Sequence, residues 1–445
     1  MDAISRQGRD ANTAVPLSIL IAVLGICFLG GTSEAYPLPR GIAQACGAAI
    51  FGIAIANGTA RLPRDVALRL LVIATVALVV AQAVPLPPSL WRELPGREIA
   101  AAVDDALGWQ VWRPVTLDWE AALEVLLFLL PCLAVLLVAG REGWRVSIAG
   151  AFALGGAIAA VFAILQALDS EWLRPFDTPH NAYVVGPFLN RNHLALFVTC
   201  AGLLAMGWAR EQAETSGGPL RRLLAGAAMA LAGIVVLLSG SRSGLAVYAA
   251  ALAGLAWVWL AAFWHGRIRA TLAVTVALAA VAGVVYFLAR DAGGPLAAIA
   301  GRQSFLLDRR FEIWPASWAL VTTYWPVGSG FGTFREVFAI AEPLAELRPL
   351  YVNHAHNDYI ELVVEGGVAA AAILSGFAVW LLVRTFAVLR TDAAARPLEW
   401  AALACLWLIA AQSLVEYSAR TVAVAALASF CLAIVVREPT KIRQS

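Results

Sequence analysis

Two closely spaced histidines are the side chains of this sequence best suited to proton transfer near neutral pH. His354 and His356 lie in the segment VNHAHNDYIELVVEGG, residues 352–367, which leads into an apolar run. Histidine is the most frequent general acid or base in enzymes, and residues two apart in an extended segment point the same way. An isolated histidine more often bonds a loop backbone. This pair favours catalysis, with His356 at the mouth of a helix that begins near Asn357.

A single arginine stands in the short turn between two apolar runs. The segment LLSGSRSGLAVY, residues 237–248, places Arg242 between Gly240 and Gly244, two residues that allow close backbone packing. The planar guanidinium group of arginine suits the oxygens of a phosphate. Arg242 is therefore a candidate for binding a phosphorylated substrate. The alternative is a helix-end anchor that binds lipid headgroups.

A dense group of hydrogen-bond donors precedes another apolar run. The segment GPFLNRNHLALF, residues 186–197, contains in succession Asn190, Arg191, Asn192 and His193. A helix N-cap explains one asparagine, but it does not explain the whole group. We expect this group to contact a ligand, and either Arg191 or His193 could face it.

A fourth segment combines arginines, aromatic residues and glycines. In RRFEIWPASWALVTTYWPVGSGFGTF, residues 309–334, Arg309 and Arg310 are candidate phosphate contacts. They precede a predicted short helix in the plane of the membrane interface. The apolar stripe predicted for this helix consists of Phe311, Trp314, Trp318 and Val321. The glycine run 328–332 follows no predicted strand, so it predicts a hinge or a tight turn rather than a nucleotide-binding loop.

Four carboxylates in the polar segment 85–120 offer another chemistry. They are Asp104, Asp105, Asp118 and Glu120. Such groups could bind a divalent metal or remain solvated loop charges, and we expect no metal and no cofactor. The six cysteines all lie in apolar runs, and we interpret them as small buried residues rather than as disulfides or metal ligands.

Membrane helices must position these side chains, because the sequence is too apolar for a soluble domain. Of 445 residues, 61% are hydrophobic and 14% are charged, and the mean hydropathy is +0.76. A soluble domain carries roughly 25% charged residues, whereas helices of about 20 apolar residues can span a lipid bilayer. The net charge of +2 gives no reason to expect a nucleic-acid partner.

Twelve apolar runs predict an all-α integral membrane protein with about 12 transmembrane helices in a single domain, residues 1–445. The runs are 14–31, 41–57, 66–84, 121–139, 147–167, 193–209, 223–239, 243–263, 271–289, 366–383, 399–416 and 421–436. Every segment predicted to be cytoplasmic carries at least two arginine or lysine residues, which places both termini in the cytoplasm. A large outer loop, residues 290–365, lies between spans nine and ten.

Ionisable side chains are nearly absent from the predicted spans. Glu365 and Glu399 lie at or near span ends, from which long side chains can reach the interface. Ion-coupled transporters usually keep a charged or histidine side chain deep inside their helical bundle. The pattern therefore favours a reaction at the outer membrane surface over a transport pathway.

In combination and in this order, the four segments resemble the O-antigen ligase and O-antigen polymerase superfamily. The resemblance covers residues 186–367. It implies a glycosyltransferase C-type helical fold in the bacterial inner membrane. It also implies a donor glycan on undecaprenyl diphosphate, which is transferred at the periplasmic face, without metal or nucleotide sugar, to an acceptor glycan or to lipid A–core.

The resemblance also implies roles for individual residues. His356 matches the histidine thought to activate the acceptor hydroxyl as general base, and Arg242 matches the arginine that steadies the donor diphosphate. Arg310 and Arg191 would be supplementary phosphate contacts.

Several functions remain open at this stage. A ligase transfers a completed chain to lipid A–core, whereas a polymerase extends a chain on its lipid carrier, and the FLNRNH segment is slightly closer to polymerase-like members. Some relatives have been named bicarbonate transporters, so a solute transporter is an alternative. A non-catalytic scaffold of a polysaccharide export complex is a third.

Overall fold

Helices form nearly all of the regular structure, as the apolar runs predict. The computed structural model describes residues 14–32, 36–168, 173, 184–213, 217–263, 310–342, 351–390 and 396–436. Within these ranges, the strands are two short antiparallel segments, β1 (Pro85–Leu86) and β2 (Arg113–Pro114). The predicted span 271–289 and the candidate Arg309 lie outside the described residues.

Each of the other predicted spans coincides with an apolar helix. These helices are α2 (Leu17–Leu29), α3 (Pro37–Ala56), α4 (Val66–Ala83), α7 (Trp119–Ala139), α8 (Arg145–Leu168), α9 (Arg191–Glu211), α10 (Gly218–Ser239), α11 (Arg242–Phe263), α16 (Asp358–Leu389), α17 (Pro397–Gln412) and α18 (Val422–Ile434). Among the described residues, 7 helices are long and apolar enough to cross a membrane. The helices indicate a multi-pass membrane protein, and the number of twelve spans stays a prediction.

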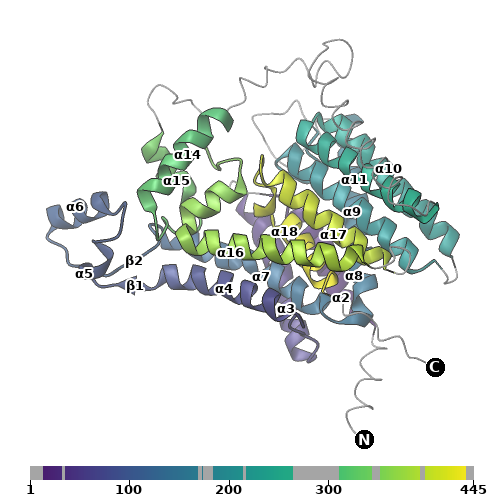
Figure 1. Ribbon diagram of the computed structural model, residues 1–445, viewed down its shortest axis with the longest axis horizontal. Coiled ribbons are helices and arrows are strands. Elements are labelled where there is room, and N and C mark those ends of the chain that lie inside the picture. The colour runs from purple at the N-terminus through teal and green to yellow at the C-terminus, as the bar shows by residue number, and fades with distance from the viewer. Residues whose placement is uncertain are drawn as a thin grey trace, which may run out of the picture.

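Shorter elements connect the apolar helices. They are α5 (Pro88–Trp91), α6 (Glu98–Leu107), α14 (Arg310–Tyr324), α15 (Phe334–Ala341) and the 3-10 turns η1 (Glu142–Trp144) and η4 (Ser418–Arg420). Figure 1 shows α5, α6 and both strands projecting from one end of the long helices. Helix α16 runs along these long helices, and its first turn lies toward the end from which α5 and α6 project.

Helix α9 is the most buried of the candidate spans. In its most apolar window, 83% of the residues are buried inside the protein, and it packs against α8, α10, α11 and α17. A Cβ on Gly202 would lie 2.9 Å from Met229 Sδ of α10, and one on Gly207 would lie 3.1 Å from Leu398 Cα of α17. Close packing through small residues is common between membrane helices. It holds the donor-rich N-terminus of α9 against its neighbours.

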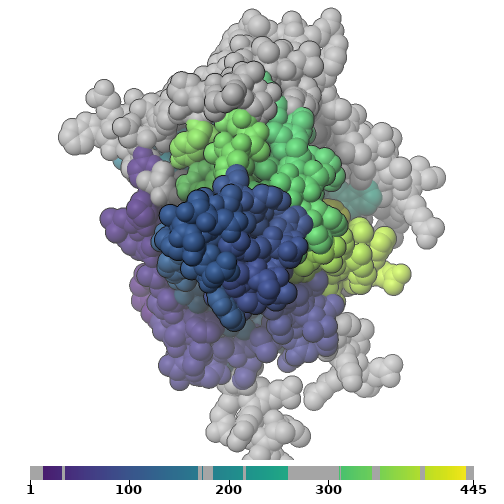
Figure 2. Space-filling model, turned by 90° about the vertical axis from the view of Figure 1, so that its left-hand side faces the viewer, coloured from purple at the N-terminus to yellow at the C-terminus, as the bar shows by residue number. Residues whose placement is uncertain are grey.

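Residues 85–117 form a small module between α4 and α7, referred to below as the projecting module. In Figure 2 it faces the viewer in blue, beside the green α14 and α15. The buried Arg97 attaches it to the rest of the protein, because its guanidinium donates to the carbonyls of Val115 and Gly328. Arg97 also lies 5.6 Å from the centre of the Tyr324 ring, within range of a cation–π contact.

The glycine run 328–332 forms a tight turn, as predicted. Gly328, Gly330 and Gly332 have φ values of 82°, 108° and 85°, in the region that favours glycine. A Cβ on Gly328 would lie 2.2 Å from the carbonyl oxygen of Glu365, and one on Gly330 would lie 2.2 Å from Thr116 Oγ1. The turn therefore packs closely against both the projecting module and the first part of α16.

Helix α14 buries one of its faces against α15 and α16. Its buried apolar residues form a cluster with α15 and α16, and they are Ile313, Leu320, Val321 and Tyr324. Of the predicted interfacial stripe, Trp318 is 59% exposed and Val321 is buried in this cluster, and the placement of the stripe in the membrane interface stays a prediction. Packing against α16 determines which face of α14 is buried. The Trp314 ring N–H donates to the carbonyl of Ala355, in the segment before α16, at 3.1 Å.

Candidate active site

Glu416, in the turn between α17 and α18, is the centre of a polar cluster that joins several sequence segments. Its side chain is fully buried. Oε1 accepts a hydrogen bond from Asn192 Nδ2 at 2.5 Å and forms an ion pair with Arg310. Oε2 lies 3.2 Å from His356 Nδ1 and 3.9 Å from His193 Nε2. Four candidate residues thus converge on a carboxylate that the sequence analysis did not single out.

The neighbours of Glu416 compensate its charge. Burial alone would raise its pKa, but the charge and hydrogen bond of His356, together with the charges of Arg310 and His193, lower that pKa from 4.5 to about 2. A buried carboxylate remains ionised only where it is paired. Glu416 therefore keeps its negative charge throughout the pH range in which histidines usually titrate.

We expect this pKa to make the fold sensitive to acid. Because the folded pKa lies below the ordinary value, the ion pairs of Glu416 stabilise the fold above about pH 4.5 and lose this contribution, about 3 kcal/mol, as the pH falls through about 2. Thermal unfolding of the detergent-solubilised protein measures it, with wild type compared to Glu416→Gln. The two proteins should differ most above about pH 5 and converge near about pH 2. A difference that does not change with pH would contradict the expectation.

The ring of Tyr417 contacts the three histidines of the site. Its centroid lies 4.1 Å from that of His354, with the rings inclined by 30°. The centroids of His193 and His356 lie 4.6 Å and 5.0 Å away, with interplanar angles of 87° and 76°. The histidines come from α9 and from the segment before α16, so the ring links two elements that are distant in sequence.

A second charged cluster lies beside the first and is centred on Arg420. Its guanidinium pairs with Glu361 at 3.1 Å and with Glu365 at 2.9 Å, and lies 3.5 Å from Asp358. The three acids are spaced by three and four residues, which places them on one face of α16. Glu361 also lies 2.7 Å from His354 Nδ1. Burial would lower the pKa of Arg420, but the three carboxylates outweigh it and raise that pKa.

The start of α16 fixes the backbone around His356. Asn357 caps the helix, because its Oδ1 accepts from the N–H groups of Tyr359 and Ile360, so the prediction of a helix beginning near Asn357 is confirmed. His356 has a φ of 51°, in the left-handed region that few non-glycine residues adopt. The side chain keeps 28% of its surface exposed, which leaves it accessible to a substrate.

The N-terminus of α9 is held by side chains of its own segment. Asn190 caps the helix by accepting from the Asn192 N–H, which is the role expected of one asparagine. Gln412 Nε2 of α17 donates to the Asn192 carbonyl at 2.9 Å. His193 is buried beneath the cluster, and Arg191 is only partly buried. Of these residues, Asn192 and His193 contact Glu416.

The turn that carries Arg242 packs against the same helix end. Ser241 Oγ donates to Asn192 Oδ1 at 2.6 Å, and a Cβ on Gly244 would lie 2.4 Å from Ala195 Cβ, so the expected close packing of this turn is present. Arg242 is the first residue of α11, and its side chain is exposed. Ser241 therefore attaches this turn to the cluster around Glu416, and the Arg242 side chain lies on the surface of the turn.

The three candidate aspartates of the polar segment 85–120 pair with arginines or cap a helix. Asp104 pairs with Arg113 at 2.5 Å, and Asp105 pairs with Arg92 at 2.6 Å. Asp118 caps α7 by accepting from the backbone N–H groups of the next turn. These contacts account for the three aspartates by their role in the fold.

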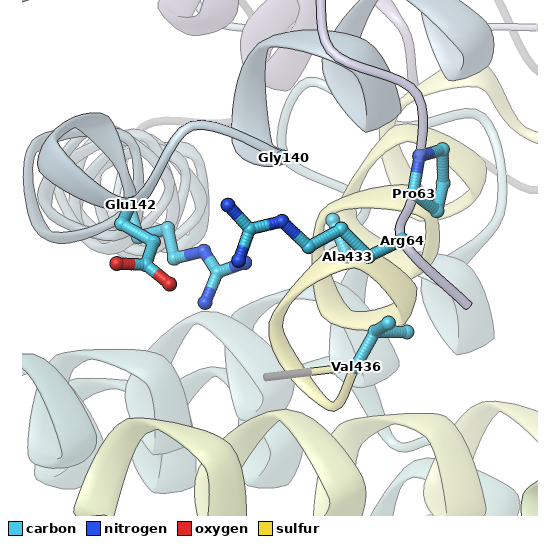
Figure 3. Close-up of a pocket in the computed structure, with 7 residues that line it drawn as sticks. Pro63, Arg64, Gly140, Glu142, Ala433 and Val436 are labelled. Carbon is cyan, nitrogen blue, oxygen red and sulfur yellow. The ribbon is translucent and has the colours of Figure 1, made fainter. Parts of the chain in front are cut away.

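A pocket lies away from this cluster. It is lined by Pro63, Arg64, Gly140, Glu142, Arg145, Ala433 and Val436 (Figure 3). Helix α18 begins five residues after Tyr417 and ends at Ile434 beside the pocket, and 13 helical residues extend about 20 Å. The pocket therefore lies at the opposite end of α18 from the histidines.

Sequence reasoning missed the acids and the turn that organise the site. Glu365, which was expected to reach the membrane interface, is fully buried, so that prediction is wrong. The reason is that α16 begins at Asp358 and carries Glu365 inward toward Arg420. Two signals were present in the sequence: the helical spacing of the acids in 358–365, and the polar segment VEYSAR, residues 415–420, between two apolar runs.

A bundle of apolar helices with an arginine- and histidine-rich cluster at their ends defines a multi-pass membrane protein with a polar site at one end. Residues 227–375 match the family model described as O-Antigen ligase. The chain therefore carries an O-antigen ligase domain, and the family resemblance is confirmed over these residues. The match includes Arg242 and His356 and leaves out Glu416. No curated protein matches the sequence.

The family match has a direct consequence for function. An O-antigen ligase domain implies an enzyme that transfers glycans and acts on lipid-linked glycan substrates. The match itself assigns no role to an individual side chain.

Proposed function

We propose that the protein transfers a glycan from undecaprenyl diphosphate to an acceptor hydroxyl at the periplasmic face of the bacterial inner membrane. Both termini then face the cytoplasm, and residues 290–365 form the large outer loop. The observation that carries the proposal is the contact of His356 Nδ1 with the buried Glu416 carboxylate. This contact leaves Nε2 of the same imidazole for the substrate.

His356 acts as the general base in this proposal. The Nδ1–H group of His356 donates a hydrogen bond to Glu416 and keeps its proton, so the lone pair is on Nε2. Nε2 takes the proton of the acceptor hydroxyl while the hydroxyl oxygen attacks the anomeric carbon of the donor. The bond between this carbon and the diphosphate oxygen breaks, and the lipid diphosphate leaves with the bonding electrons. The Glu416 carboxylate stabilises the imidazolium that forms, as a buried carboxylate does beside other catalytic histidines.

The departing diphosphate gains negative charge and needs cations that stay charged at the working pH. We assign the stabilisation of the departing diphosphate first to Arg242. Its side chain is exposed and lies on the turn whose Ser241 hydroxyl donates a hydrogen bond to Asn192. Arg310 and Arg191, with Arg309, are supplementary phosphate contacts. The ion pair between Arg310 and Glu416 also supports a link between the phosphate contacts and the base.

The remaining candidates belong to the substrate-binding part of the proposal. They are His354, Asn190, Asn192 and His193. Asn192 and His193 act through Glu416, which they contact directly. The reaction needs neither a nucleotide sugar nor a metal in this scheme, because the lipid diphosphate is already an activated leaving group.

Replacing His356 or Arg242 by alanine is expected to abolish glycan transfer without loss of protein. The measurement is a gel profile of cell-surface polysaccharide in a deletion strain that expresses wild type, His356→Ala or Arg242→Ala. Arg222→Ala is the matched control, because Arg222 is an exposed arginine in the first turn of α10, at the other end of that helix from the turn of Arg242.

The polysaccharide profile also distinguishes the possible reactions. Single-repeat units that accumulate on the carrier would identify a polymerase, and long chains stranded on the carrier would identify a ligase. Normal polysaccharide from both alanine variants, at the protein level of wild type, would contradict the assigned roles. An unchanged profile in the deletion strain would favour the transporter alternative.

A further inference from the structure

We infer that Tyr417 is a positioning residue of the reaction, whose ring holds the imidazoles of His354 and His356 in the arrangement that proton transfer requires. The inference rests on the proposed function and adds a residue outside 227–375, the range of the family match. It concerns the orientation of the histidines, and it assigns no bond-making or bond-breaking step to Tyr417.

The first support is the way in which the histidines surround one ring. The His354 ring is inclined by 30° to the Tyr417 ring, with centroids 4.1 Å apart. His356 and His193 approach it almost at right angles, at 5.0 Å and 4.6 Å. Edge-to-face pairs at such distances are a favoured arrangement of aromatic rings. A single side chain therefore limits the rotation of three imidazoles.

The second support is that His354 and His356 are each held by a carboxylate as well as by the Tyr417 ring. Glu361 lies 2.7 Å from His354 Nδ1, and Glu416 lies 3.2 Å from His356 Nδ1. Nδ1 and Nε2 lie on opposite sides of an imidazole. A carboxylate on Nδ1 therefore turns the Nε2 atom of each ring away from that carboxylate, and the Tyr417 ring limits rotation out of this orientation.

The third support is the backbone of His356. The left-handed region is unfavourable for a non-glycine residue, and His356 has a φ of 51°. Such a conformation persists only where the surroundings hold it. The side-chain contacts of His356 run to Glu416 and Tyr417, two successive residues of the same turn. Removing the ring would take away one of the two side-chain contacts that help to hold this conformation.

The hydroxyl of Tyr417 ties the same two segments together. It accepts a hydrogen bond from Asn353 Nδ2 at 3.5 Å and also bonds Asn190. Burial, and next the charge of Glu416, raise the pKa of Tyr417 to about 12. The hydroxyl therefore stays protonated at neutral pH, which suits a group that positions its neighbours rather than one that exchanges a proton with the substrate.

The test compares two substitutions in the full-length protein with a lipid-diphosphate-linked glycan as donor. Tyr417→Phe keeps the ring and removes the hydroxyl, and we expect kcat within about threefold of wild type, since only weak hydrogen bonds are lost. Tyr417→Leu removes the ring, and we expect kcat to fall about 10- to 100-fold, with the KM for the donor changed by less than about threefold. The acidic limb of the pH profile of kcat should also move in the leucine variant, because the environment of the base has changed.

The control is Tyr359→Leu, which removes a tyrosine whose hydroxyl donates to the Ala410 carbonyl on α17. It should keep the wild-type pH profile. Tyr417→Met, which fills similar space without an aromatic face, replaces Tyr417→Leu if that protein is not recovered folded, and the same changes are expected. A leucine or methionine variant with the kcat and pH profile of wild type would overturn the inference, and so would a change confined to KM.

His356→Ala separates this inference from the proposed function. If His356→Ala still transfers glycan at the wild-type rate, the general-base role of His356 in the proposed function fails, and the inference fails with it. If His356→Ala is inactive while Tyr417→Leu behaves as wild type, only the positioning role of Tyr417 is contradicted.

Discussion

Replacing Glu416 by glutamine is expected to reduce kcat for glycan transfer by about 10²- to 10⁴-fold. Glutamine keeps the shape of the side chain but removes the negative charge that would stabilise the imidazolium of His356. Its amide can also donate to Nδ1, and the imidazole proton then moves to Nε2, where the proposed base needs a lone pair. Arg310 loses its buried counter-ion in the same variant.

The experiment measures initial rates of Glu416→Gln against wild type at equal amounts of folded protein. Glu399→Gln is a matched control, because Glu399 is a buried carboxylate that pairs with Arg396 at 3.1 Å on α17. The control should lose some stability and little kcat. A Glu416→Gln enzyme as fast as wild type would show that His356 does not depend on this carboxylate.

Replacing Arg420 by methionine is expected to destabilise the fold by about 3–5 kcal/mol. Methionine fills similar space, but it leaves the carboxylates of Asp358, Glu361 and Glu365 close together without their shared cation. Buried charges without a partner are among the largest single causes of instability. Because Glu365 also accepts from the Gly332 N–H at 3.0 Å, the damage should extend to the glycine turn.

The yield of monodisperse protein in detergent and its thermal midpoint measure this effect. Arg40→Met is the control, because Arg40 pairs at 2.9 Å with Glu124, whose side chain is 50% exposed, and such pairs contribute about 0–1 kcal/mol. Adding Glu365→Gln to Arg420→Met should recover part of the loss, since one buried charge is removed. Equal stability of Arg420→Met and Arg40→Met would contradict the account of the cluster.

The two variants separate chemistry from architecture. Glu416 and Arg420 stand four residues apart in one turn, yet they serve different clusters. The first contacts the proposed base, and the second ties α16 to η4. We therefore expect Glu416→Gln to lower the rate per folded protein, and Arg420→Met to act through the amount of folded protein alone.

Local patterns in the sequence predicted much of this protein. Long apolar runs predicted the helices, because a helix that satisfies its own backbone is the stable way to bury such a run in lipid. The caps at Asn190 and Asn357 and the tight turn at 328–332 were also predictable, since each depends on residues within one helical turn. The motif segments, read together, predicted the O-antigen ligase match, and three of the four lie within residues 227–375.

The tertiary structure decided which of these side chains meet, and it added residues that no single segment marks. Asn192, Arg310 and His356 come together on Glu416, although 224 residues separate Asn192 from Glu416. Glu365 reads as a helix-end glutamate in the sequence, and only the position of Arg420 explains its burial. The local sequence pattern indicates how a segment satisfies its own backbone hydrogen bonds and buries its apolar surface. The partner of a buried charge depends on which distant elements pack against it, and helix packing determines that.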